Sequence, residues 1–413
     1  MQEIVEAQKP QFLRWELLLL AAIVLLAYGL QVPSPLRVNT DVETILTLTA
    51  KLTDHQPYLV NGQKPVFPIG VPLVFSLMER GGIATALGFN LFNLSCIIIT
   101  AIASVSIWWS LGLRGFGPAV ATILAFSNFV LLKHALLPLT DVPYLAASLL
   151  ALAVLERAQD DPNRLRRVIV FVVAAGLVMA AIIVRRVGVA LAPALGYFIW
   201  RQGKWARITG GLLCVIAVLF GVFRGAFYMP DFWKKVGELS VGAYAIHVVR
   251  ARAVDLGEVL INAPIDKLHR VAIIFPIAGV MLLMLVVVGL WRARKNIRPS
   301  HIYLIFYMVI LFAWPYQDNR FWLPVLPLFA IVIYQALQPW LNYAAVRRLI
   351  ASYVVVYGAF FAIAAVYTTR ITYSADFPDS YASGKLAGDY REAWSARRLT
   401  TPAAVVIRRY GMR

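Results

Sequence analysis

The chain consists of long hydrophobic blocks that are separated by charged or proline-rich stretches. Blocks that approach about 20 apolar residues are typical of membrane-spanning helices. The pattern predicts about eleven spans, and the first is a retained helix because no small-residue cleavage pattern follows it. The predicted spans cover residues 15–32, 85–111, 116–134, 141–156, 168–184, 187–200, 207–223, 271–291, 301–314, 321–337 and 349–367.

Three segments are too polar to lie in lipid, namely residues 33–84, 224–270 and 368–413. We therefore expect an all-α integral membrane domain over residues 1–367 and a short tail over residues 368–413. Within the domain, the loops 33–84 and 224–270 are expected to form the functional face, with amphipathic helices lying along the membrane interface.

Composition and charge support this assignment and indicate how the protein is oriented in the membrane. Of the 413 residues, 60% are hydrophobic and 15% charged, which excludes an ordinary soluble domain or a disordered chain. The net charge is +18, and most basic loop residues occupy alternate connections, at Arg114, Arg157, Arg164, Arg166, Arg167, Arg201, Lys204, Arg207, Arg292, Arg294, Lys295, Arg298, Arg347 and Arg348. This asymmetry predicts a multi-pass protein of the cytoplasmic (inner) membrane, with its N-terminus in the cytoplasm and the three polar segments facing the periplasm or outside. Because the charge is dispersed, we expect no nucleic-acid partner.

Two apolar stretches are too short for two full spans and a loop, so each is expected to form a tight hairpin. Residues 168–200 place Arg185 and Arg186 at a recessed tip, and residues 301–337 place Tyr316–Arg320 at another. Charges held below the membrane surface are costly and are therefore candidates for function. The alternative is that these side chains extend to the lipid headgroups.

The loop after the first helix contains Thr40-Asp41-Val42-Glu43, which has the form of a helix capping box built on Thr40. An amphipathic helix follows, and it is too short to span the membrane. The capping box accounts for Thr40 and Glu43 but not for Asp41. A carboxylate at this position could act as a general base, or it could only stabilise the helix N-terminus.

Four features in this order resemble the polytopic GT-C glycosyltransferases, in particular the protein-mannosyltransferase and aminoarabinose-transferase-like group. They are Asp41 at the head of the loop helix, the proline-rich Phe67–Leu73, Thr140-Asp141-Val142-Pro143 at the start of the fourth span, and Asn319–Leu328 at the start of a late span. Together they touch residues 39–80, 138–156 and 315–337.

The resemblance implies a transferase that uses a polyprenyl-monophosphate sugar at the outer face of the membrane. Asp41 matches the family's catalytic carboxylate, the base that takes the proton of the acceptor. Asp141 matches a second acidic residue near the acceptor, and Arg320 matches a basic residue that binds the donor phosphate. Lys64-Pro65 departs from the aminoarabinose-transferase-like members, in which a second proline and a leucine follow. The short tail favours a lipid- or glycan-linked acceptor over a protein.

The chemistry of such a transfer needs a base for the acceptor hydroxyl and positive charge for the departing phosphate. Arginine suits the second role because its planar fork binds phosphate oxygens in pairs, so Arg185 and Arg186 join Arg320 as candidates. We expect no metal or other cofactor, and a single displacement that inverts the anomeric centre. The five histidines form no spaced metal pair.

The remaining candidates for lining the pocket are His55, Tyr58, Lys64, Lys133 and Asn319. The alternative function is a polytopic transporter or a lipid or glycan flippase. A transporter driven by protons or ions needs charged residues in the middle of its spans. The predicted spans are nearly free of central acids, which favours the enzyme.

Overall fold

The computed structural model describes residues 14–60, 62–203, 207–212, 215, 237–238, 240–314, 316–395 and 398–411. In these ranges the chain is helical and has no β-strand, apart from an isolated bridge between Val60 and Gln63. The α-helices are α1 (Arg14–Ile23), α2 (Thr40–Thr53), α3 (Gly70–Arg80), α4 (Ala86–Ser110), α5 (Gly117–Phe126), α6 (Phe129–Ala135), α7 (Asp141–Ala158), α8 (Arg164–Val184), α9 (Leu191–Trp200), α12 (Val241–Ile261), α13 (Ile274–Ala293), α14 (Pro299–Ala313), α15 (Leu326–Leu337), α16 (Ala344–Thr372), α17 (Phe377–Tyr381), α18 (Gly384–Ser395) and α19 (Pro402–Gly411).

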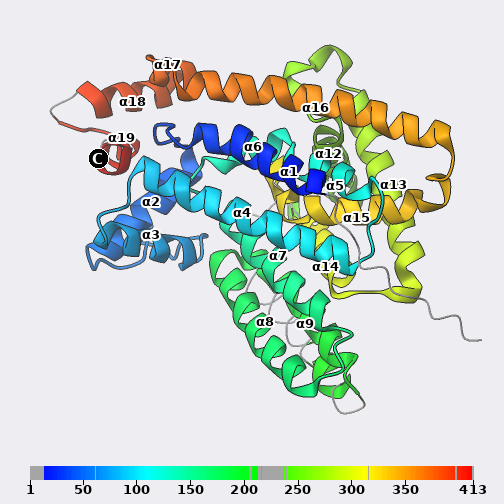
Figure 1. Ribbon diagram of the computed structural model, residues 1–413. Helices are drawn as coiled ribbons and strands as arrows, with labels where there is room; N and C mark the ends of the chain where they lie inside the picture. Colours follow the sequence, from blue (N-terminus) through cyan, green and yellow to red (C-terminus); the bar gives the residue numbers. More distant parts are fainter. Residues whose placement is uncertain are drawn as a thin grey trace, which may run out of the picture.

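Short 3₁₀ and π turns connect several of these helices. They are η1 (Val24–Tyr28), η2 (Gly29–Gln31), η3 (Arg186–Ala190), η5 (Ile265–Lys267), η6 (His269–Val271), η7 (Arg294–Asn296), η8 (Asn319–Val325) and η9 (Gln338–Trp340). In Figure 1, α16 runs along one side of the bundle and α8 and α9 lie on the opposite side, while α2, α3 and the tail helices α17–α19 gather at one end.

Five helices of the described ranges are long and apolar enough to cross a membrane: Ala86–Ser110, Leu165–Val184, Ile274–Asn296, Asn319–Trp340 and Ala344–Thr372. Helices α5 and α6 form a sixth if they count as one span that is bent by 49°. Shorter apolar helices cover Trp15–Gln31, Arg186–Trp200 and Pro299–Ala313. The predicted all-helical, multi-pass architecture is confirmed, but the predicted number of about eleven spans is not. The predicted span 207–223 and the first part of the loop 224–270 lie largely outside the described residues.

Helix α2 is fixed by protein contacts at its start and along its apolar face. Asn39 caps the helix, because its side chain accepts a hydrogen bond from the backbone N–H of Val42 at 2.9 Å. The expectation that Thr40 is the cap is therefore wrong: Thr40 and Asp41 lie in the first turn. Val42, Ile45 and Leu46 of α2 are fully buried and belong to a core cluster shared with α3, α18 and α19, so this helix rests on protein along that face.

The hairpin predicted around Arg185 is present. Helix α8 ends at Val184, Arg185 is extended, and η3 begins at Arg186, so that α9 returns along α8. Where η3 packs on α8, a Cβ at Gly188 would lie 2.7 Å from the backbone of Ala181. This close approach fixes the turn against α8 and holds the two arginines at the tip.

The helices α12 and α13 also touch backbone to backbone. A Cβ at Gly279 would lie 1.8 Å from the carbonyl oxygen of Ala253, and one at Gly257 would lie 2.0 Å from that of Phe275. Small residues allow helix pairs to approach this closely in membrane proteins. Helix α12 is therefore held tightly against a candidate span.

Candidate functional site

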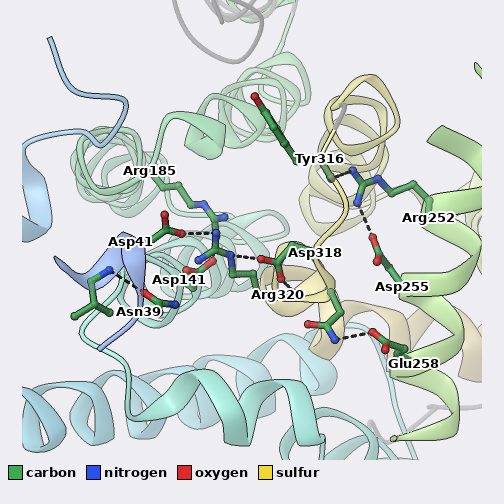
Figure 2. Close-up of polar contacts among 12 residues, drawn as sticks. Asn39, Asp41, Asp141, Arg185, Arg252, Asp255, Glu258, Tyr316, Asp318 and Arg320 are labelled. Carbon is green, nitrogen blue, oxygen red and sulfur yellow. Dashed lines mark hydrogen bonds and ion pairs between the residues drawn. The ribbon is translucent and has the colours of Figure 1, made fainter. Parts of the chain in front are cut away.

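Asp41, Asp318 and Arg320 form an ion-pair cluster where α2 meets η8 (Figure 2). Arg320 Nη2 lies 2.5 Å from Asp41 Oδ2, and Arg320 Nε lies 2.8 Å from Asp318 Oδ2. Asp318 is also the N-cap of η8, because its Oδ1 accepts a hydrogen bond from the backbone N–H of Arg320 at 3.0 Å. One guanidinium is thus held between two carboxylates from distant parts of the chain.

A second ion pair lies beside the first. Arg185, at the tip of the α8–η3 hairpin, donates from Nη1 to Oδ1 of Asp141, the first residue of α7. The guanidinium carbons of Arg185 and Arg320 each lie 5.4 Å from the ring centre of Phe321, so both cations face the same aromatic ring. Asp41, Asp141, Arg185 and Arg320, which the sequence places in four separate segments, therefore lie together.

These ion pairs line a cavity of about 420 Å³. Its wall contains three carboxylates and three guanidiniums, from Asp41, Asp141, Asp318, Arg185, Arg186 and Arg320. Aromatic rings cover much of the remaining wall and come from Phe67, Tyr307, Trp314, Tyr316 and Phe321. A pocket with a few convergent charged groups on an otherwise apolar and aromatic wall is typical of a ligand site.

A second, larger cavity of about 930 Å³ adjoins the cluster of Asp41, Asp318 and Arg320. Asp41, Asp318 and Arg320 line both cavities and thus form the partition between them. The larger cavity is bounded by residues of α6, the segment after α12, and α16. From α16 it receives Phe360, Ile363, Ala364 and Tyr367, and Ile363 and Tyr367 are largely exposed on the molecular surface. One side of this cavity is therefore apolar and continuous with a candidate span.

Burial shapes the electrostatics of the partition. The pKa of Asp318 is raised above its usual value because burial disfavours the carboxylate, and this effect exceeds the opposing attraction of Arg320. The side chain of Arg320 is only 16% exposed, whereas that of Asp41 is 31% exposed. Asp318 is 32% exposed, so the two carboxylates that hold Arg320 are about equally accessible.

The other residues singled out from the sequence lie in different surroundings. Arg186 lines the smaller cavity and donates to the carbonyl oxygen of Pro65 at 3.2 Å. Lys133 lines the larger cavity. The Tyr58 hydroxyl braces the proline-rich stretch by donating to the carbonyl oxygens of Phe67 at 3.0 Å and Pro68 at 3.1 Å.

Three further sequence candidates lie outside the walls of both cavities. Lys64 and His55 are exposed and line neither. Asn319 instead donates from its side chain to Glu258 on α12 at 2.7 Å. In the described ranges, no three His, Cys, Asp or Glu side chains are grouped so as to hold a metal ion.

Sequence reasoning gave no role to two residues that structure this site. Asp318 belongs to the predicted hairpin tip, whose charges are candidates for function, but it was assigned no specific role. Its signal is the Asp-Asn-Arg order, in which a cap residue stands two positions before the arginine. For its contacts with the loop, Arg252 has no such signal, because the carbonyl groups that it binds lie about 60 residues away in the sequence, with Leu311, Trp314 and Tyr316 at 59, 62 and 64 positions.

No protein-family model matches the sequence, and no curated protein is significantly similar to it. Solved structures do match the fold. ArnT from Cupriavidus metallidurans in the apo state superposes with a TM-score of 0.55 at 15% identity, over 96% of this chain and 85% of that one. The same protein bound to undecaprenyl phosphate gives 0.51 at 14% identity, with the same coverage.

An archaeal oligosaccharyltransferase, AglB from Archaeoglobus fulgidus in complex with an inhibitory peptide and a dolichol-phosphate, gives a TM-score of 0.50 at 13% identity over 93% of this chain. The chain spans 58% of the length of that protein. At such low identities the likeness concerns the backbone arrangement, and it agrees with the fold that the sequence motifs predict. The chain has the fold of the GT-C membrane glycosyltransferases.

Proposed function

We propose that the protein is a membrane glycosyltransferase that moves a monosaccharide from a polyprenyl monophosphate to a hydroxyl of a lipid- or glycan-linked acceptor at the outer face of the inner membrane. The observation that carries this proposal is the partition, in which Asp41 and Arg320 face two cavities at once. Solved structures of two proteins with the same fold contain undecaprenyl phosphate and a dolichol-phosphate, respectively, which supports a lipid phosphate as the donor.

The smaller cavity suits the sugar phosphate of the donor. Arg185, Arg186 and Arg320 converge there, and guanidinium forks bind phosphate oxygens in pairs. The aromatic wall offers rings against which a sugar can pack. Asp141 lines this cavity and not the larger one, so in this proposal it orients Arg185 beside the donor.

The larger cavity suits the acceptor. Its size, its basic residues Arg37, Lys133 and Lys267, and its apolar side along α16 fit an amphiphile with an anionic head and acyl or prenyl chains. Asp41 and Asp318 both line this cavity and are about equally exposed. We assign Asp41 as the base that an acceptor hydroxyl meets from this side, because Asp318 is already engaged as the N-cap of η8.

The reaction follows from this arrangement. Asp41 takes the proton of the acceptor hydroxyl while its oxygen forms the bond to the anomeric carbon. The bond between that carbon and the phosphate oxygen breaks, and the negative charge that develops on the polyprenyl phosphate is stabilised by the arginines. Because acceptor and leaving group occupy opposite sides of the partition, the single displacement inverts the anomeric centre.

The ion pair between Asp41 and Arg320 also bears on the order of events. While Arg320 holds Asp41, one oxygen of the carboxylate is engaged in the ion pair and is not free to accept the proton of the acceptor hydroxyl. A donor phosphate that binds Arg320 competes for the guanidinium and weakens this hold. Asp41 then acts as the base when a donor is bound. The acceptor is therefore not deprotonated while no leaving group is in place.

The test uses the full chain in lipid nanodiscs with a panel of undecaprenyl-phosphate monosaccharides and lipid acceptors. We expect release of undecaprenyl phosphate together with a glycosylated acceptor whose anomeric configuration is inverted. The same lipids in sealed proteoliposomes test the flippase alternative. Movement of the labelled donor across the bilayer, without cleavage of the sugar from the phosphate in either assay, would overturn the proposed transferase.

A further inference from the structure

A fully buried arginine, Arg252 on α12, holds the loop that carries Asp318 and Arg320. Its Nε donates to the carbonyl oxygen of Leu311 at 3.1 Å, and its Nη2 donates to those of Trp314, at 3.0 Å, and Tyr316. Its Nη1 donates to Oδ2 of Asp255 at 2.6 Å. Figure 2 shows Arg252 beside Tyr316 and Asp255, on the side of the loop away from Asp41.

The chemistry of these contacts is specific to arginine. A buried charge is costly unless it is paired and its hydrogen bonds are satisfied, and here Asp255 supplies the counter-charge. The last carbonyl groups of a helix lack partners inside that helix, and Arg252 reaches the end of α14 and the loop that follows. A lysine has the same charge but no planar fork that could reach three carbonyl groups in fixed directions.

Two more side chains of α12 hold the same region from either side of Arg252. The Tyr244 hydroxyl donates to the carbonyl oxygen of Ala313 at 2.9 Å. Glu258 accepts from the Asn319 side chain at 2.7 Å and, with its other oxygen, from the backbone N–H of Ile265 at 2.7 Å. Helix α12 thus contacts the chain before and after the loop, from the end of α14 to the start of η8.

The helix that supplies these contacts is itself immobilised. Its backbone lies against α13 at Gly257 and Gly279, where no larger residue fits. Arg252 and Glu258 line neither cavity. Their contacts with the loop are therefore suited to set its position without touching a substrate.

We propose that Arg252 and Glu258 are positioning residues that fix Asp318 and Arg320 at the partition and thereby set the affinity for the donor phosphate. The expected effect on donor affinity rests on the proposed function. The structural part of the inference concerns only the order of the loop. A displacement of about 1 Å at a reacting group can cost about 100-fold in rate, so a loosened loop affects donor use strongly.

The test compares Arg252→Lys with Arg292→Lys. Arg292 is a matched control, because its Nη1 donates to the carbonyl oxygen of Ala336 at 2.7 Å near the far end of α15, away from both cavities. We expect R252K to lower kcat/KM for the donor by about 10- to 100-fold with little change in the acceptor KM. R292K leaves both parameters near wild type. Equal losses in the two variants, or equal losses for donor and acceptor in R252K, overturn the proposal.

An independent readout is hydrogen exchange of the amides from Tyr316 to Phe321. We expect faster exchange there in R252K than in wild type and no change in R292K. If exchange in R252K matches wild type, the positioning role is wrong whatever the activity. Exchange could rise as expected while neither wild type nor any variant transfers sugar. In that case the proposed function and the effect on donor affinity are both wrong, but the role of Arg252 in ordering the loop stands.

A milder substitution covers the case in which R252K does not fold. Glu258→Gln replaces one of the two acceptor oxygens by an amide nitrogen and so removes one of the bonds to Asn319 and Ile265. We expect a several-fold rise in the donor KM and faster exchange at Asn319 and Arg320. If hydrogen exchange and the donor KM of this variant both equal those of wild type, the proposal is wrong.

Discussion

Helix α2 has an acid–arginine cluster at each of its ends, and the two clusters differ in what surrounds them. At the start, Asp41 pairs with Arg320, which also pairs with Asp318. At the end, Asp54 accepts two hydrogen bonds from Arg409 on α19, both at 3.0 Å. Arg409 also donates to Glu79 at 2.7 Å, and the Tyr410 hydroxyl donates to the same carboxylate at 2.8 Å.

The distances in the two clusters are similar, so distance alone does not separate a site from a structural contact. The first cluster lies between two cavities, whereas Asp54, Glu79 and Arg409 line neither cavity. In the second cluster, one guanidinium is shared among carboxylate oxygens of Asp54, the C-cap of α2, and Glu79 on α3. That cluster fastens the tail to the helix. The comparison teaches that an ion pair becomes a candidate for chemistry when a ligand can reach it.

The largest difference between the two ends is expected from Asp41→Asn and Asp54→Asn. Loss of a general base typically costs about 10²- to 10⁴-fold in rate, so D41N should reduce turnover by that order and keep the folded protein. D54N should turn over at the wild-type rate. The measurement is sugar transfer from a polyprenyl-phosphate donor, with circular dichroism as a check on folding. Near-normal turnover in D41N removes Asp41 as the base.

The two arginines give the second comparison. Arg320→Lys keeps the charge but loses the fork that binds phosphate oxygens in pairs. Removing one such stabilising group typically costs about 10²- to 10³-fold in kcat, and we expect a loss of that order with a weaker affinity for undecaprenyl phosphate. Arg409→Lys should leave both values unchanged. If R320K binds the lipid phosphate as wild type does, the phosphate contact lies elsewhere.

The third prediction concerns pH and Asp318. Its pKa is raised by burial, so the folded chain binds this proton more tightly than the unfolded chain does. The resulting contribution to stability is fully present below the ordinary aspartate pKa of about 3.9 and is lost as pH rises through the raised value. The melting temperature of wild type relative to Asp318→Asn should therefore increase as pH falls from neutral. A relative decrease would mean that Arg320 outweighs burial.

The smallest effect is expected at the tail, and its sign is opposite. Hydrogen bonds from Arg409 hold the pKa of Asp54 below its usual range, so this contribution to stability is present above the ordinary value and lost as pH falls. Because Asp54 is partly exposed, Arg409→Ala should cost only about 1 kcal/mol. Limited proteolysis should cut sooner near α19, without loss of transfer. A variant that resists proteolysis as wild type does would show that the tail is held mainly by apolar contacts.

The sequence predicted the features that depend on local pattern. Hydrophobic blocks predicted an all-helical membrane chain, and the shortness of residues 168–200 predicted the hairpin tip at Arg185. Asn39 was missed as the cap of α2 because Asn and Thr are both common caps, and only the backbone geometry distinguishes them. The predicted number of about eleven spans is not confirmed, because several apolar blocks form short helices and the predicted span 207–223 lies largely outside the described residues.

The sequence predicted several residues of the site but not the ion pairs that they form. Arg185 was chosen because it interrupts a short apolar stretch, and Asp41, Asp141 and Arg320 were chosen because they match motifs of the resembling family; both signals are local. Which acid meets which arginine depends on how α2, α7, α8 and η8 pack. The same limit explains Lys64, which was a candidate for lining the pocket yet is exposed and lines neither cavity. Arg252 was missed because its contacts are with main-chain atoms of a distant segment.

The partition has a consequence for the thermodynamics of the two substrates. A ligand in one cavity that draws Arg320 away from Asp41 changes the charge that faces the other cavity. Donor and acceptor affinities are then linked by a coupling free energy, and the factor by which the donor changes acceptor binding equals the factor by which the acceptor changes donor binding. We expect this coupling between donor and acceptor binding to depend on Asp41 and Arg320.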